Sequence, residues 1–246
     1  MFELIRSNKR RSVALVACFM LFIVLVGAAI GALVGNGIAF TLVALVFSGS
    51  VAFYSYWRAD KIALKISRAE PASEIQYQRL HNIVEGLCIA AGLPKPGVYV
   101  IDDPAPNAFA TGRNPEHAAI AVTSGLLEML NRVELEGVIA HELGHIKNYD
   151  ILVSTLAVTM VGAVALLADG AIRLMWWNGG RVSRSGDRSN GNNPLAYAGF
   201  ALLVLSPIIA KAMQAAVSRS RETLADVTAC QLTRYPPGLI SALEKL

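Results

Sequence analysis

Cysteine is scarce in this chain, and the few cysteines form no pattern. The 246 residues contain three, Cys18, Cys88 and Cys230. None of them belongs to a CxxC pair, and an odd, scattered set offers no disulfide framework. This excludes a fold that depends on disulfide bonds. We expect all three side chains to pack as small apolar groups, in a core or against lipid.

Charge is also scarce. Charged residues make up 16% of the chain and hydrophobic residues 54%, whereas an average soluble domain has about 25% charged residues. The composition therefore excludes an ordinary soluble domain and indicates membrane segments. The net charge of +4 does not indicate nucleic acid, because the basic residues cluster at the ends of apolar runs, as is typical of membrane proteins. The expected partner is a lipid bilayer.

Two apolar runs follow the basic N-terminus. Residues 12–57 are almost uncharged and are interrupted only by a Gly-Asn-Gly turn at 35–37, and a bilayer crossing needs about 20 apolar residues. The pattern predicts two transmembrane helices, 13–34 and 38–57, which form an N-terminal segment, 1–57. A cleavable signal peptide fits less well, because its apolar part is usually about 7 to 15 residues long and no second span follows it.

A second pair of apolar stretches, 151–177 and 195–217, flanks a polar loop. Asp169 and Arg173 in the first stretch can pair one turn apart and so reduce the cost of carrying charge in lipid. We expect residues 151–217 to form a helical hairpin that crosses the membrane twice. A hairpin that does not cross stays open as an alternative.

Basic residues flank the two N-terminal spans, and they predict orientation. Those that precede the first span are Arg6, Lys9, Arg10 and Arg11, and those that follow the second are Arg58, Lys61, Lys65 and Arg68. Positive charge favours the cytoplasmic side of a membrane, so the following segment, 58–150, is expected in the cytosol. Arginines in the later polar loop oppose this rule if the hairpin crosses, but the earlier charges usually dominate.

The segment 58–150 has the patterns of a small mixed domain. The predicted elements are a helix over 72–91, a strand over 98–101, a hairpin of 108–111 with 118–123, and a helix over 132–148. Asn131 with Glu134 three residues later is typical of a capping box at the start of the last helix. The fold class is therefore mostly α with a small β-sheet, in a polytopic α-helical membrane protein.

The last predicted helix carries His141-Glu142-Leu143-Gly144-His145. Two histidines four residues apart lie on one helical face, so both imidazoles can bind one metal ion. Glu142 beside them is placed to accept a proton from a water molecule rather than to bind the metal. The five-residue pattern also occurs by chance, so by itself it is also compatible with an ordinary helix that binds no metal.

A catalytic zinc site needs a third protein ligand. The chain has four histidines, and we interpret the other two, His81 and His117, as ordinary surface or core residues. Glu222 and Asp226 share a helical face one turn apart. Glu222 can serve as the ligand while Asp226 accepts a hydrogen bond from the outer nitrogen of a ligand histidine. A solvated acidic face next to arginines is the alternative.

Taken together, these motifs resemble a known family. The HExxH motif, Arg-Glu-Thr-Leu-Ala-Asp at 221–226, Asn-Ala-Phe-Ala-Thr-Gly at 107–112 and the paired N-terminal spans resemble the HtpX-like membrane zinc metallopeptidases, which are relatives of the CAAX prenyl-protein endopeptidases. The resemblance covers nearly the whole chain. It implies a cytosolic zincin-like catalytic domain with one Zn²⁺ per chain, in which Glu222 is the third ligand, Asp226 supports a histidine and Glu142 is the general base.

The resemblance also implies a biological role. It is that of a multi-pass protease of the bacterial cytoplasmic (inner) membrane that degrades misfolded or damaged membrane proteins and unfolded polypeptides, as part of stress response and protein quality control. Members of the family usually continue for some tens of residues, so 218–246 is expected to be a shortened C-terminal segment. A CAAX-type peptidase that acts on defined termini and a catalytically silent zinc-binding scaffold stay open, and the pattern does not indicate an oligomeric state.

Two further elements of an active site are predicted. A hydrogen-bond donor for the tetrahedral oxyanion is required, and Arg219 and Tyr149 are candidates. A strand close before the catalytic helix is the candidate edge strand for an extended substrate, although an internal strand fits equally well. Its residues are Ala118, Ala119, Ile120, Ala121, Val122 and Thr123. Because one zinc ion cannot be shared across a bilayer, the hairpin must cross twice or not at all.

Overall fold

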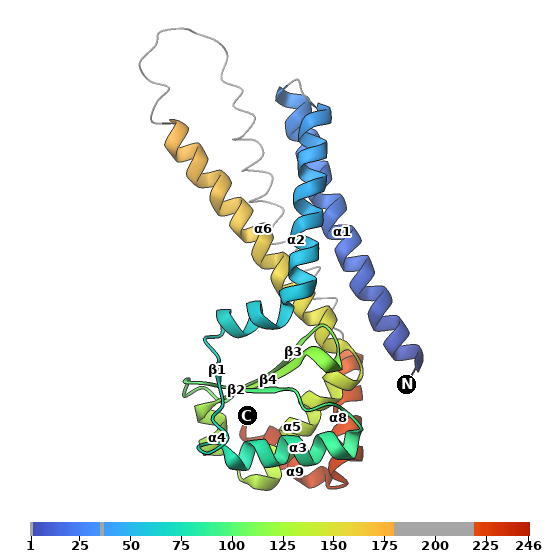
Figure 1. Cartoon of the computed structure of the whole chain (residues 1–246), viewed down its shortest axis with the longest axis vertical. Coiled ribbons are helices and arrows are strands. Elements are labelled where there is room, and N and C mark those ends of the chain that lie inside the picture. The colour runs from blue at the N-terminus through green and yellow to red at the C-terminus, as the bar shows by residue number, and fades with distance from the viewer. Residues whose placement is uncertain (1, 35–36, 180–218) are drawn as a thin grey trace. The chain divides into compact units, whose positions relative to one another are not determined.

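The computed structural model describes residues 2–34, 37–179 and 219–246, and the chain divides into two compact units. The first, which we call the sheet unit, comprises Met1–Ser12, Tyr56–Leu156 and Val217–Leu246. The second, which we call the apolar unit, comprises Val13–Ser55 and Ala157–Ala216. The described part is mostly helical with one small mixed sheet (Figure 1). The sheet unit thus joins most of the predicted segments 58–150 and 218–246 into one body.

Long helices supply the described part of the apolar unit: α1 (Phe2–Val34), α2 (Gly37–Ile66) and α6 (Asp150–Gly179), each of which also extends into the sheet unit. Helices α1 and α2 approach closely at Gly27, where an added Cβ would lie 2.3 Å from the Cβ of Ala44. Small residues at such crossings are typical of helices that pack in membranes. Large apolar side chains on α2, such as Val43 and Val46, are exposed, as lipid-facing side chains are.

Among the described residues, one helix, Ile38–Arg58, is long and apolar enough to cross a membrane. It matches the predicted span over 38–57. In α1 the apolar stretch, Ser12–Ala28, is shorter than a span, and the start of α6 passes the same test only together with the preceding helix, across a bend of 85°. The predicted stretch 195–217 lies outside the described residues. The multi-pass topology therefore stays a prediction.

The sheet has the strand order β1-β2-β4-β3. Its strands are β1 (Glu70–Pro71), β2 (Gly97–Ile101), β3 (Ala108–Gly112) and β4 (Ala118–Thr123). Strand β4 pairs in parallel with β2 and antiparallel with β3, with Ala110 opposite Ile120. The hairpin of β3 and β4 is as predicted.

The edge-strand prediction for Ala118, Ala119, Ile120, Ala121, Val122 and Thr123 is wrong. These six residues form β4, which is paired on both sides and fully buried. Their nearly continuous apolar sequence is the reason, because a strand without a polar alternation is typical of one that is covered on both faces. The last strand in the sheet order is instead β3.

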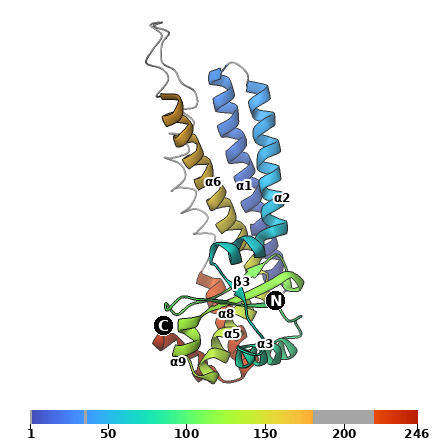
Figure 2. The same ribbon diagram turned by 60° about the vertical axis from the view of Figure 1, so that its left-hand side comes forward.

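Helices cover both faces of this sheet (Figures 1 and 2). One face packs with α3 (Gln78–Ala91) and α5 (Arg132–Lys147) in a core that includes Leu80, Ile120 and Ile139. On the other face, Leu64 near the end of α2 packs against Ala119 and Ala121. The remaining described elements of the sheet unit are a short 3-10 turn η1 (Pro115–His117) and the helices α4 (Ser124–Met129), α8 (Arg219–Thr233) and α9 (Pro236–Lys245).

Helix α3 begins later than predicted. Residue 72 belongs to the extended chain that follows β1, since its N–H donates to the carbonyl of Val98 at 3.0 Å, and the helix starts at Gln78. It ends as predicted at Gly92, which adopts the left-handed conformation of a C-cap. Cys88 lies buried on this helix, and burial raises the pKa of its thiol to about 11, which fits the predicted packing role.

The capping box at the start of α5 is confirmed. Asn131 accepts from the backbone of Glu134 at 3.0 Å, and the Glu134 carboxylate accepts from the Asn131 N–H at 2.9 Å. Glu134 also accepts from Ser241 at 2.6 Å and from Lys245 at 2.7 Å, both on α9. The ammonium of Lys245, with these hydrogen bonds, lowers the pKa of Glu134 to about 2. A buried carboxylate therefore ties α9 to the N-terminus of the HExxH helix.

Candidate metal centre

The centre begins with α5, which presents His141 and His145 on one face, one turn apart. Their Nε2 atoms are 3.1 Å apart, and the two rings meet edge to face with centroids 4.7 Å apart. Glu222 comes from the first turn of α8. Its Oε2 atom lies 3.5 Å from Nε2 of His141 and 3.7 Å from Nε2 of His145. Two helices that are distant in sequence thus bring three ligand atoms to one point.

These separations fit a single metal ion. Zinc binds imidazole nitrogen and carboxylate oxygen at about 2.0 to 2.2 Å in tetrahedral geometry, which places neighbouring ligand atoms about 3.3 to 3.6 Å apart. The three separations, 3.1, 3.5 and 3.7 Å, lie within or close to that range. His141, His145 and Glu222 can therefore hold one ion without rearrangement of their helices.

Carboxylates hold the outer nitrogens of both histidines. Nδ1 of His141 lies 2.9 Å from Asp226, and Nδ1 of His145 lies 3.3 Å from Asp150. If each Nδ1–H donates to its carboxylate, both Nε2 lone pairs face the same point. Two lone pairs 3.1 Å apart repel each other unless a cation lies between them. The hydrogen bonds therefore select the tautomers that a metal site requires.

Asp226 lies where the sequence predicted it, behind a ligand histidine. Asp150 was not predicted. It follows His145 by five residues and is almost completely buried. In the sequence it stands at the start of an apolar stretch, where an acidic residue is typical of a helix N-terminus. A carboxylate within a turn or two of a ligand histidine was the available signal, but the sequence does not reveal how the chain turns between α5 and α6.

Glu142 is buried on the same helix as the two histidines. Burial raises the pKa of its carboxyl to about 7, against the lowering effects of the His145 charge and of a hydrogen bond from the backbone N–H of Ala110. Ala110 lies on β3, at the end of the sheet order. The carboxyl can thus exchange a proton near neutral pH, directly beside the strand that ends the sheet.

The two histidines differ in their preference for a proton. Burial lowers the pKa of His141, and the charge of His145 lowers it further, against the effects of Asp226 and Glu222. Burial also acts to lower the pKa of His145, but the hydrogen bond to Asp150 and the nearby carboxylates outweigh it and raise that pKa. A metal ion requires both rings to be neutral at Nε2, and His141 already favours that form.

Gly144, inside the HExxH motif, permits the third ligand to approach. An added Cβ would lie 3.2 Å from Cα and O of Ala225 and 3.3 Å from Thr228, all on α8. These contacts are tighter than ordinary van der Waals distance, so a side chain would push α8 away. The glycine therefore sets the distance between α5 and the helix that carries Glu222 and Asp226.

The remaining residues singled out in the sequence lie outside the cluster of metal ligands. Tyr149 occupies the turn between α5 and α6 with a φ of 60°, and Arg219 is the first residue of α8, although its side chain is outside the described part. His81 contacts the carbonyl of Ala72 at 3.0 Å and His117 contacts Asn114 at 2.8 Å. Neither belongs to the metal cluster.

A helix that presents two histidines and a buried carboxyl, completed by a glutamate from a second helix, defines a metal-dependent peptidase of the HExxH type. Comparisons with known proteins agree. Peptidase family M48 matches residues 74–246. The chain is 43% identical over 249 residues to Protease HtpX homolog of Streptococcus uberis, covering all of this chain and 84% of that protein. The homologue from Listeria monocytogenes is 45% identical over 256 residues, with the same coverage.

The fold has a counterpart among solved structures. The crystal structure of Ste24p from S. mikatae matches 94% of this chain with a TM-score of 0.50 and 18% identity, and the chain spans 57% of the length of that protein. At this identity the likeness concerns the fold. Because the family matches residues 74–246 and the relatives match over the whole of this chain, the chain belongs to Peptidase family M48. It is a membrane-bound metallopeptidase.

Proposed function

We propose that this chain is a zinc-dependent endopeptidase of the bacterial inner membrane that hydrolyses misfolded or damaged membrane proteins at the cytosolic face, as part of stress response and quality control. The observation that carries the proposal is the convergence of His141, His145 and Glu222 beside the buried carboxyl of Glu142. A peptidase acting in this way needs a metal, a base and a place for an extended peptide.

Zinc, one ion per chain, is the metal that the donor set favours. Two imidazoles and one carboxylate suit zinc, whereas magnesium and calcium prefer sites made of oxygen. Zinc in such a site polarises a carbonyl oxygen and lowers the pKa of a water molecule toward about 7. Three protein ligands leave one position for substrate. That favours a catalytic site over the structural site of a silent scaffold, which would close all four positions.

Glu142 is the general base in this proposal. Its carboxyl has a pKa raised to about 7, which a neighbouring cation would lower, so that it is ionised at neutral pH. It accepts a proton from the attacking water and passes it to the leaving amine. Tyr149 and Arg219 stay candidates for the donor that stabilises the oxyanion.

Strand β3 takes the substrate role that the sequence suggested for β4. It ends the strand order of the described sheet, and its Ala110 donates the backbone N–H to Glu142. An extended peptide that adds to a sheet edge forms main-chain hydrogen bonds with it. A peptide paired with β3 would carry its scissile carbonyl past the base and the metal ligands.

The choice of membrane proteins as substrates rests on the distance along the chain between the site and the apolar helices. Asp150, the first residue of α6, follows His145 by five residues, and α6 continues into the apolar unit. Unfolded cytosolic stretches of membrane proteins are tethered at the same bilayer. The basic residues before α1's apolar stretch and after the span of α2 support the cytosolic orientation.

Reconstituted protein tests this function. The chain is reconstituted into liposomes in the presence of zinc and is incubated with a destabilised membrane protein or with a short farnesylated peptide. We expect cleavage of the membrane protein, and a loss of at least about 100-fold in rate for Glu142→Gln, since general acid–base catalysis contributes that much. Cleavage of the farnesylated peptide alone would indicate a CAAX-type peptidase instead. A zinc-loaded protein that cleaves neither substrate would indicate a scaffold.

A further inference from the structure

The end of α2 carries a row of basic side chains that the metal centre does not use. Arg58, Lys61, Lys65 and Arg68 follow one another at spacings of three, four and three residues. Lys61 and Lys65 share one side of the last turns of α2, Arg58 stands at the break before these turns, and Arg68 stands just after the helix ends. All four are exposed. Within the described residues none of them forms an ion pair with a carboxylate, and the only acidic residue between them is Asp60. We call these four residues the basic row.

Leu64, which lies between the basic residues in sequence, fixes the same segment to the sheet. Leu64 is 7% exposed and packs against Ala119 and Ala121 of β4. The helix ends in a turn in which the N–H of Ala69 donates to the carbonyl of Leu64 at 2.9 Å, with Arg68 in the left-handed region at a φ of 52°. Because Leu64 anchors the segment to the sheet, the exposed basic row is held in place by the same body rather than being a mobile tail.

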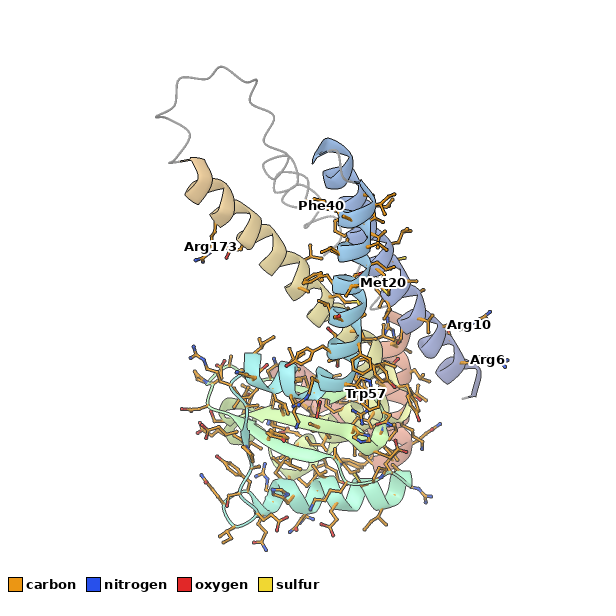
Figure 3. The ribbon with its side chains drawn as sticks, turned by 45° about the horizontal axis from the view of Figure 1, so that its top comes forward. Arg6, Arg10, Met20, Phe40, Trp57 and Arg173 are labelled. Carbon is orange, nitrogen blue, oxygen red and sulfur yellow. The ribbon has the colours of Figure 1, made fainter. Side chains whose placement is uncertain are left out.

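The segment begins where the apolar span ends. The span of α2 is Ile38–Arg58, and Arg58 has the non-helical angles φ −118° and ψ 15°. Just before this break lies Trp57, which is 48% exposed and is labelled at that end of α2 in Figure 3. Tryptophan is enriched at membrane interfaces. The basic row therefore begins at the end of the apolar span, where the regular helix is broken.

A fifth basic residue, Arg113, contacts Trp57 at the start of the basic row. The guanidinium of Arg113, in the loop between β3 and β4, lies 4.5 Å from the centroid of the Trp57 ring and donates to the Trp57 carbonyl at 3.3 Å. Ile66, between Lys65 and Arg68, is 67% exposed. A basic face with an exposed apolar residue, directly after a span, is the composition of a helix that lies in the headgroup region.

We propose that the basic row, with Arg113, is a binding surface for the headgroups of anionic phospholipids in the bilayer that holds α2. The inference rests on the proposed cytosolic orientation, since the cytosolic leaflet is where the row would meet anionic lipid. The occupant follows from charge complementarity, because four cations against one carboxylate follow directly after the span of α2. Because Leu64 rests on β4, the same contact holds the sheet, and with it β3, at the membrane surface.

Lipid binding by the whole chain tests the proposal. The protein carries Glu142→Gln, so the readout does not depend on proteolysis and the proposed enzymatic function can fail separately. Purified in detergent, it is titrated with phosphatidylglycerol and with phosphatidylcholine, and bound lipid is counted by native mass spectrometry. We expect preferential binding of phosphatidylglycerol. Because each basic residue near an anionic surface contributes a similar increment, Lys61→Gln with Lys65→Gln should weaken it about 30-fold.

The matched control removes the same charge from another face. Arg132→Gln with Arg234→Gln eliminates two exposed arginines of the sheet unit and should leave phosphatidylglycerol binding within about twofold. Unchanged circular dichroism and zinc content check that each variant is folded. Equal binding of the two lipids by the parent protein, or an equal loss in the control pair, would overturn the proposal. So would displacement of the lipid by inorganic phosphate at equal concentration, which would indicate a general anion site.

Discussion

Asp150 is not one of the three clustered ligands, yet its carboxylate sets the orientation of the His145 ring. The hydrogen bond of 3.3 Å involves a carboxylate whose side chain is 4% exposed, so no water can replace it easily. Partners of this kind typically change metal affinity by about 10- to 100-fold when they are removed. Asp150→Asn should therefore weaken zinc binding by that factor, measured by competition with a chromophoric chelator.

The control for Asp150 is a second aspartate on the same helix. Asp169 pairs with Arg173 at 2.8 Å, and both side chains are exposed. Asp169→Asn should leave zinc affinity unchanged. A zinc affinity in Asp150→Asn equal to that of the parent protein would mean that His145 is oriented by the helix alone.

Glu134 predicts an acid dependence of stability. Its pKa is lowered from 4.5 to about 2 in the folded chain, chiefly by Lys245 and Ser241. A lowered folded-state pKa contributes stability that is fully present above the unfolded value and is lost as pH falls toward the folded value. The Tm of the parent protein should therefore fall between about pH 4.5 and pH 2 more steeply than that of Glu134→Gln.

Glu136→Gln is the matched control for Glu134, because it removes a neighbouring carboxylate on the same helix that forms no such contacts with α9. It should keep the slope of Tm against pH that the parent protein has. Parallel curves for the parent protein and Glu134→Gln would show that the bonds to α9 do not favour the ionised carboxylate.

At the residue scale the sequence predicted His141, Glu142, His145, Glu222 and Asp226 as the site, and the structure brings these residues together. Helical spacing puts His141 and His145 on one face with Glu142 beside them. Spacing made Glu222 and Asp226 candidates, and the resemblance to the HtpX-like family then favoured them over a solvated acidic face. Asp150 escaped prediction because its contact with His145 depends on the turn at Tyr149, which has a φ of 60° and lies at the 85° bend between α5 and α6. No sequence pattern marks that turn.

At the scale of elements, Gly144 controls how closely α8 packs on α5. Overpacking a close helix crossing costs about 1 to 3 kcal/mol, and the strain is relieved here if α8 moves outward with Glu222. Gly144→Val should therefore weaken zinc binding strongly while the helix itself forms. Zinc affinity measured together with circular dichroism separates loss of the third ligand from unfolding.

Gly86→Val provides the comparison, because it adds the same side chain to a helix of the sheet unit at a position where a Cβ meets nothing within 4 Å. It should bind zinc as the parent protein does. Equal zinc affinity in Gly144→Val and Gly86→Val would show that α8 does not depend on the small residue at the crossing.

Strand order is the element-scale feature that the sequence left open. The elements of the hairpin were predictable from their β-branched and apolar composition, but which strand lies at the edge depends on β2 pairing with β4 over a long separation. The contact of Leu64 with the sheet was equally unpredictable, because it joins the end of a membrane helix to a distant strand.

At the scale of the whole molecule, the chain's orientation in the membrane remains a prediction from its charges. Composition identified the span Ile38–Arg58 correctly, because about 20 apolar residues suffice for that inference. In a cysteine-free background, Ser73→Cys on the sheet unit should react with an impermeant thiol reagent only after lysis. Ser183→Cys, in the predicted loop outside the described residues, should react in intact cells. Labelling of Ser183→Cys only after lysis would contradict two crossings by the hairpin.

The most direct test of the central claim is the zinc content of purified protein, measured by mass spectrometry of the metal. The parent protein and Glu142→Gln should each hold about one zinc ion per chain, because Glu142 acts as a base and not as a ligand. Glu222→Ala should lose the ion, since the third of three ligands is gone. A Glu222→Ala protein that still holds one zinc ion per chain would contradict the account.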